Sequence, residues 1–129
     1  MSDPIFLNIV QIEALHTMAL EQHGGQPGIR DRAALESAVA QPRNVFYYSG
    51  GDHFDVAAAY AFHLAEAQSF VDGNKRVGMA AALVFLRLNG VTIGCATDKF
   101  HAAMIGISGH QISRSDLALL FRTSPHSPL

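Results

Sequence analysis

Apolar residues recur every three or four positions along most of the chain, which is the period of an α-helix. In the first such stretch Ile12, Leu15 and Met18 share one face. Asn8 stands where a helix would be capped, and two glycines at 24–25 stop the pattern. The sequence therefore predicts a first helix between Asn8 and these glycines.

The next two helices are bounded by turn-forming residues. A second helix is expected to begin at the capping residue Asp31, run through Ala40 and close at Pro42. Residues 43–52 mix aromatic residues with glycines and indicate a loop or a short hairpin. A third helix is then predicted over residues 55–69.

The stretch from Asn74 to Leu88 differs from the others because it has almost no polar face between Val77 and Leu86. A helix that is apolar on all sides is surrounded by other elements. We therefore expect this fourth helix to be the buried centre of a compact all-α bundle.

The last third of the chain predicts shorter elements. A short extended link is expected at 91–95, a fifth helix at about 97–108 and a final short helix that ends at Arg122. Residues 1–122 are expected to form a single domain. The polar tail 123–129 is expected to be disordered.

Composition narrows the function classes. With 129 residues, 49% of them apolar, the chain can bury a core without metal or disulfide staples. A net charge of −2 gives no general attraction to nucleic acid or to an anionic membrane, and the apolar run 77–86 is too short to span a bilayer. The only cysteine, Cys95, excludes an internal disulfide, and the polar start Met1-Ser2-Asp3-Pro4 is unlike a signal peptide. We expect a cytoplasmic protein that binds neither membranes nor nucleic acid directly.

Candidate chemistry is concentrated where the third helix gives way to the fourth, in Gln68-Ser69-Phe70-Val71-Asp72-Gly73-Asn74-Lys75-Arg76. The first N–H groups of a helix have no internal partner and attract anions. Lys75 and Arg76 add full charges there, and Asp72 offers oxygen ligands suited to Mg²⁺. The pattern predicts a cradle for the phosphates of a nucleotide, although it is not a P-loop. An ordinary turn, with Asn74 as N-cap and two solvated basic residues, is the alternative.

This segment resembles the signature of the Fic/Doc (Fido) family, in its Doc (death-on-curing) toxin branch, through Phe70 and the run Asp72 to Arg76. The stretches 24–38 and 85–90 are also similar to Doc proteins, so the resemblance covers residues 6–120. It implies a Fido-type helical bundle with a small β-hairpin flap near Val45 to Tyr48, above the active site.

The resemblance also implies roles for the residues of the motif. Family members transfer a phosphate-containing group from a nucleotide to a hydroxyl of a target protein, with a histidine as general base. Asp72 would hold Mg²⁺, and Phe70 would anchor the loop. The amides of Gly73 and Asn74 would bind phosphate, and the side chains that follow would neutralise charge during transfer. Those side chains belong to Lys75 and Arg76.

The position of the family's catalytic histidine is occupied by Gln68. An amide cannot accept a proton near neutral pH, and loss of a general base costs ~10²–10⁴-fold in rate. Three accounts remain open. The substitution is engineered, or it is natural and leaves a silent nucleotide- or partner-binding protein, or the base lies elsewhere. His63, His53 and Glu66 are the candidates for that base, although His63 points about 140° away from Gln68 on a helix.

The resemblance bears on the transferred group and on the partners. AMP-transferring members usually carry a second arginine at the position of Met79, and methionine cannot bind phosphate. The resemblance therefore favours a kinase-like transferase that passes on the γ-phosphate of ATP, with AMP transfer as the alternative. The implied target is a translation factor, elongation factor Tu by analogy, so translation would be inhibited. No inhibitory Ser/Thr-x-x-x-Glu-Gly/Asn segment is present, so an antitoxin helix supplied in trans is expected to bind in a groove.

The remaining histidines do not have metal-ligand spacing with cysteines or carboxylates, so no zinc site is expected. Two of them are expected to be ordinary helix-face residues, His16 and His101. The others are His23, His110 and His126.

Overall fold

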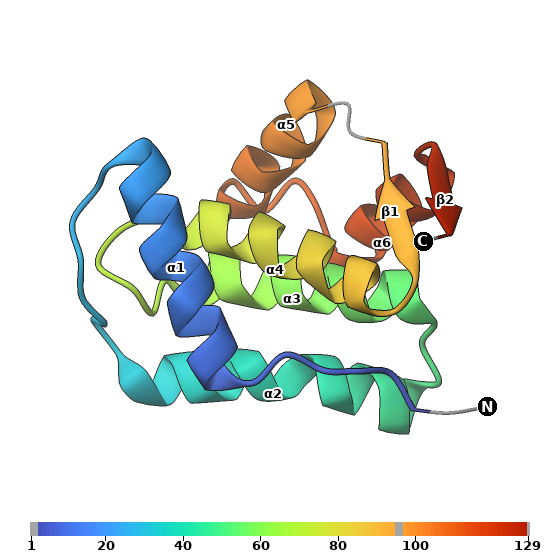
Figure 1. Cartoon of the computed structure of the whole chain (residues 1–129), viewed down its shortest axis with the longest axis horizontal. Coiled ribbons are helices and arrows are strands. Elements are labelled where there is room, and N and C mark those ends of the chain that lie inside the picture. The colour runs from blue at the N-terminus through green and yellow to red at the C-terminus, as the bar shows by residue number, and fades with distance from the viewer. Residues whose placement is uncertain (1–2, 95–96, 129) are drawn as a thin grey trace.

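The computed structural model describes residues 3–94 and 97–128. Six helices of this part of the chain pack into one bundle, and two short strands pair beside it (Figure 1). The helices are α1 (Ile9–His23), α2 (Arg32–Ser49), α3 (His53–Ala67), α4 (Asn74–Leu88), α5 (Thr97–Ser108) and α6 (Arg114–Thr123). The predicted all-α class is confirmed. No described helix is long and apolar enough to cross a membrane.

Side-chain caps explain where most of these helices begin. Asn8 and Asp31 accept a hydrogen bond from the third backbone N–H of α1 and of α2, as the sequence predicts. Helix α3 begins two residues earlier than expected because Asp52 and Asp55 form a reciprocal capping box. Ser113 caps α6 in the same way.

Helix α2 overturns two predictions. It does not close at Pro42 but continues to Ser49, and the expected β-hairpin flap at Val45 to Tyr48 is instead its last turns. Proline costs a helix one hydrogen bond and some steric strain. Here the turns beyond it bury Val45 and pack the ring of Phe46 edge-on against Phe6 (centroids 6.0 Å apart), so tertiary contacts outweigh the local cost.

The centre of the bundle is α3 and not α4. Every residue from Val56 to Ala61 is buried, and α3 contacts α2, α4, α5 and α6. The apolar surface of α4 serves two purposes. One side, with Ala81 and Phe85, packs on α3, whereas Leu83 and Val84 are only half-buried and face a pocket. The expectation of a central fourth helix was wrong because an apolar face can line a pocket as well as a helix interface.

The α3–α4 contact depends on Gly78. A Cβ placed on this residue would lie 2.7 Å from the carbonyl oxygen of Ala61, a backbone atom that cannot move aside. Gly78→Ala is therefore expected to lower the free energy of unfolding by about 1–2 kcal/mol, even after the gain in helix propensity, as measured by chemical denaturation.

Gly109→Ala is the control for this prediction. Gly109 directly follows α5, and its added Cβ would have no neighbouring heavy atom closer than 3.7 Å, which is ordinary van der Waals contact. We expect a smaller loss of stability than at Gly78. Equal losses in the two variants would contradict the close backbone approach at Gly78.

The described part of the chain is tied down near both of its ends. The Leu7 N–H donates to the Tyr60 hydroxyl (2.8 Å), which donates in turn to the Leu7 carbonyl (3.1 Å), and burial raises the pKa of Tyr60 to about 12. At the other end β2 (His126–Pro128) pairs antiparallel with β1 (Val91–Ile93). The tail expected to be disordered forms a β-strand from His126 to Pro128. The backbone partners come from β1, which the composition of the tail does not reveal. Cys95 and Leu129 lie outside the described residues.

Candidate functional site

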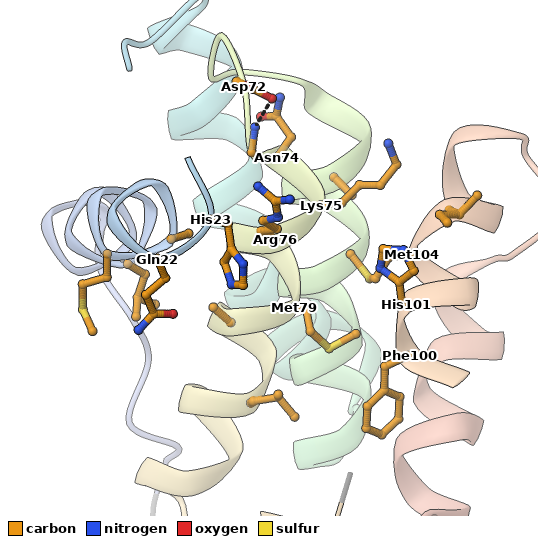
Figure 2. Close-up of a pocket in the computed structure, with 18 of the residues that line it drawn as sticks. Gln22, His23, Asp72, Asn74, Lys75, Arg76, Met79, Phe100, His101 and Met104 are labelled. Atoms are coloured by element: carbon orange, nitrogen blue, oxygen red, sulfur yellow. Dashed lines mark hydrogen bonds between the residues drawn. The ribbon is translucent and has the colours of Figure 1, made fainter. Parts of the chain in front are cut away.

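A pocket of about 950 Å³ opens between α1, α4 and α5, with the α3–α4 loop at one end (Figure 2). Most of its lining is apolar, including Met79, Leu83 and Val84 of α4 and Met104 of α5. Its charged side chains come from the loop end. They belong to Asp72, Lys75 and Arg76. The pocket therefore has one cationic end and a longer apolar body.

Gln68 ends α3 in a left-handed conformation (φ 48°, ψ 43°), which few residues other than glycine adopt. This turn exposes the Gln68 side chain to the pocket and redirects the chain into the loop. The loop then runs beside residues 28–31. The Ser69 carbonyl accepts hydrogen bonds from the N–H groups of Arg30 (2.7 Å) and Asp31 (3.0 Å), and Phe70 bridges to Ile29. The Gly-Ile-Arg-Asp stretch at 28–31 thus holds the loop in place through backbone hydrogen bonds.

Asn74 closes the loop on itself. Its side-chain amide donates to the Phe70 carbonyl, its side-chain oxygen accepts from the Phe70 N–H, and both distances are 3.0 Å. The assignment of Asn74 as N-cap is wrong, because Gly73 occupies the N-cap position in a left-handed conformation (φ 77°). A residue with a Cβ would be strained there.

The N-terminus of α4 has no side-chain cap. Its first N–H groups therefore lack a capping partner at the positive end of the helix dipole, beside the exposed side chains of Lys75 and Arg76. Neither basic side chain forms an ion pair with a described residue. The amide of Gly73 is already engaged by Asp72 Oδ1 at 2.9 Å. The arrangement offers unneutralised positive charge to an anion at the mouth of the pocket.

Asp72 is held at the rim of the pocket. Besides accepting from Gly73, its carboxylate accepts from the Gln26 N–H through Oδ2 at 3.2 Å. No three described His, Cys, Asp or Glu side chains are grouped as the ligands of one metal ion. A single carboxylate fits Mg²⁺, which usually takes one or two protein ligands and completes its shell with phosphates and water. The residues present are thus compatible with a nucleotide-bound Mg²⁺.

His16 belongs to the site, although the sequence indicates only a helix-face residue. Its ring stacks on Phe70 (centroids 3.8 Å apart, 10° between planes), and its Nε2 lies 2.7 Å from the Asp72 carbonyl oxygen. Because a carbonyl can only accept, Nε2 must carry the hydrogen. One signal was available: His16 follows Ile12 by four residues on the buried face of α1, and a buried polar group needs a partner.

The candidate substitute bases lie away from the pocket. His63 packs toward α6, and burial together with the nearby charge of Arg114 lowers the pKa of His63 to about 4. His63, His53 and Glu66 are not among the described residues that line the pocket, whereas His23 and His101 are. Figure 2 shows these two imidazoles on opposite sides of it. Sequence neighbourhood could not identify them because α1 and α5 approach the loop only in the folded bundle.

Comparison with known proteins finds a matching family model and similar relatives. The sequence model of the Fic/DOC family matches residues 6–86. The chain is 32% identical over 107 residues to "Protein kinase doc" of Escherichia phage P1, and the alignment covers 74% of this chain and 85% of that relative. It is 42% identical over 79 residues to "Toxin Doc" of Mycolicibacterium smegmatis (strain ATCC 700084 / mc(2)155), covering 58% of this chain and 59% of that relative.

Proposed function

Since this chain belongs to the Fic/DOC family, we propose that it is a Doc-type toxin that transfers a phosphoryl group from Mg²⁺-bound ATP to a hydroxyl of a target protein, slowly because Gln68 replaces the general base. The observation that supports this best is the uncapped N-terminus of α4, with the unpaired charges of Lys75 and Arg76 beside it at the mouth of the pocket. Such a terminus favours phosphate oxygens.

Phosphoryl transfer requires mainly that the protein positions the reactants and neutralises the phosphate charge. The target's hydroxyl oxygen bonds to the γ-phosphorus as the bond from that phosphorus to the ADP oxygen breaks, and the hydroxyl proton passes to solvent water. Lys75 and Arg76 would offset the charge on the phosphate oxygens, which is the main protein contribution to phosphoryl transfer. Asp72 would hold Mg²⁺, which when bound neutralises phosphate charge. Gln68 could orient the hydroxyl but could not take its proton.

The side chain one turn after Arg76 favours phosphoryl transfer over AMP transfer. Met79 lines the pocket there, and its thioether offers no positive charge to a second phosphate. The cationic end of the pocket is therefore short. It suits one phosphate group better than a clamp along the whole triphosphate, and AMP transfer stays the second possibility for the enzyme.

A catalytically silent binding protein is the second candidate function. The Gln68 side chain that lines the pocket is not basic, while the cradle beside it keeps the charges of Lys75 and Arg76. Such a protein would bind nucleotide or partner and transfer nothing. His23 and His101 are the pocket residues that could instead supply a base, and a residual activity lost in His23→Ala or His101→Ala would identify which one does so.

Mass spectrometry of a purified target after incubation with ATP and Mg²⁺ tests the proposal. Elongation factor Tu is the first target to use. A gain of one phosphoryl group on a hydroxyl side chain supports the kinase-like activity, and a gain of AMP supports the alternative transfer. Calorimetric binding of ATP without any modification supports the silent protein. If ATP does not bind, the cradle does not serve a nucleotide.

The apolar body of the pocket suits the antitoxin segment that the proposal requires. An amphipathic helix could lay its apolar face on Leu83 and Val84 between α1 and α5. Leu83→Lys is expected to weaken binding of the proposed antitoxin helix about tenfold or more, because the complex would bury an unpaired charge. Leu88→Lys on the exposed end of the same helix is the control, measured by the same titration. Equal losses would place the antitoxin elsewhere.

A further inference from the structure

We infer that His16 is a positioning residue of the cradle: by holding the Asp72 carbonyl, it sets the orientation of the peptide that joins Asp72 to Gly73. The test of this inference by nucleotide affinity rests on the proposed function, whereas its test by the conformation of the loop does not. His16 lies on α1, more than fifty positions before the loop in sequence, so it links a separate helix to the site.

Three contacts place the imidazole against this peptide. The Nε2–H of His16 donates to the Asp72 carbonyl at 2.7 Å, and the ring lies flat on Phe70. A Cβ on Gly73 would lie 3.4 Å from the same Nε2, so the backbone of the loop passes close to this edge of the ring. His16 itself is only 4% exposed, so water does not compete freely for its donor.

The orientation of this peptide controls the carboxylate of Asp72. The carbonyl and the N–H of a trans peptide point in opposite directions, so fixing the carbonyl on His16 turns the Gly73 N–H the other way. That N–H donates to Asp72 Oδ1 at 2.9 Å. A flipped peptide would break both hydrogen bonds and turn a carbonyl oxygen toward the carboxylate.

Glycine makes such a flip accessible. Gly73 has no Cβ to resist a change of backbone conformation, so the loop itself offers little opposition. The Gln26 N–H holds only the other carboxylate oxygen of Asp72, at 3.2 Å. The hydrogen bond from His16 is therefore the contact from outside the loop that favours this peptide orientation, and through it the place of the expected metal ligand.

Two substitutions separate the hydrogen bond from the ring. His16→Gln keeps an N–H donor at a similar reach and removes the stacking, whereas His16→Phe keeps the stacking and removes the donor. We expect the Gly73 amide to give one NMR signal in the ligand-free wild type and in His16→Gln, but doubled or broadened signals in His16→Phe. The dissociation constant for an ATP analogue with Mg²⁺ should rise about tenfold in His16→Phe and little in His16→Gln. If His16→Phe does not fold, His16→Met removes the donor with a more adaptable side chain.

Each outcome decides the inference. A single unshifted Gly73 signal in the donor-free variant overturns it, and so does an equal disturbance in His16→Gln, which would assign the effect to the ring. If the wild type does not bind the ATP analogue, the proposed function fails, while the NMR comparison still decides the role of His16. Melting temperatures of all variants show whether a binding loss follows from stability alone.

Discussion

Gln68→His is expected to raise the rate of ATP-dependent transfer to the target by about 10²–10⁴-fold, the usual contribution of a general base. The backbone at this position is left-handed, and histidine is among the side chains that tolerate this conformation best. The new imidazole would point from an exposed position into the pocket that Arg76 and Lys75 also line. The loop needs no rearrangement to receive it.

The measurement is the initial rate of phosphate incorporation into the target, followed by growth of cells that express the variant. Gln68→Asn is the matched control, since it changes the side chain but adds no base, and its rate should not rise above the wild-type level. If Gln68→His gains nothing while ATP still binds, the base lies elsewhere or the protein is silent. His23→Ala in the wild type then tests the first possibility, because any residual rate should fall with it.

The sequence predicts local features well where short-range rules decide them. The bounds of α4 are as expected because Gly73 precedes it and Asn89-Gly90 follows its apolar run. The caps Asn8 and Asp31 are also confirmed, since a cap is a contact between near neighbours. Gln68 and the run Asp72 to Arg76 likewise lie at one end of the pocket, whereas Phe70 is buried and does not line it.

The failures share one cause, which is contact between segments far apart in sequence. Pro42 should end α2 by local rules, but Val45 has a place in the core beyond it. An apolar run such as Val77 to Leu86 does not say whether each face meets a helix or a pocket. The role of His16 depends on a loop that is distant in sequence, so its helical neighbours give little sign of it.

Arg76→Ala is the second change with a large expected effect. The guanidinium lies beside the uncapped N-terminus of α4 and has no ion-pair partner among the described residues. It is therefore free to make charge-assisted hydrogen bonds with a phosphate, which are stronger than neutral ones. Losing them should weaken binding of ATP with Mg²⁺ by roughly 10–100-fold in a calorimetric titration.

The same helix supplies the control that identifies the cause of such a loss. Arg87 is also exposed, but it lies in the last turn of α4 and does not line the pocket. Arg87→Ala removes the same charge from the protein. Its effect on ATP affinity therefore measures the general electrostatic attraction of the protein for the nucleotide, which falls as salt is added. At physiological salt the dissociation constants of the two variants for ATP with Mg²⁺ should differ by most of the predicted loss of roughly 10–100-fold. Equal affinities would mean that the phosphates do not sit at the N-terminus of α4, and the nucleotide would then have to bind in another part of the pocket.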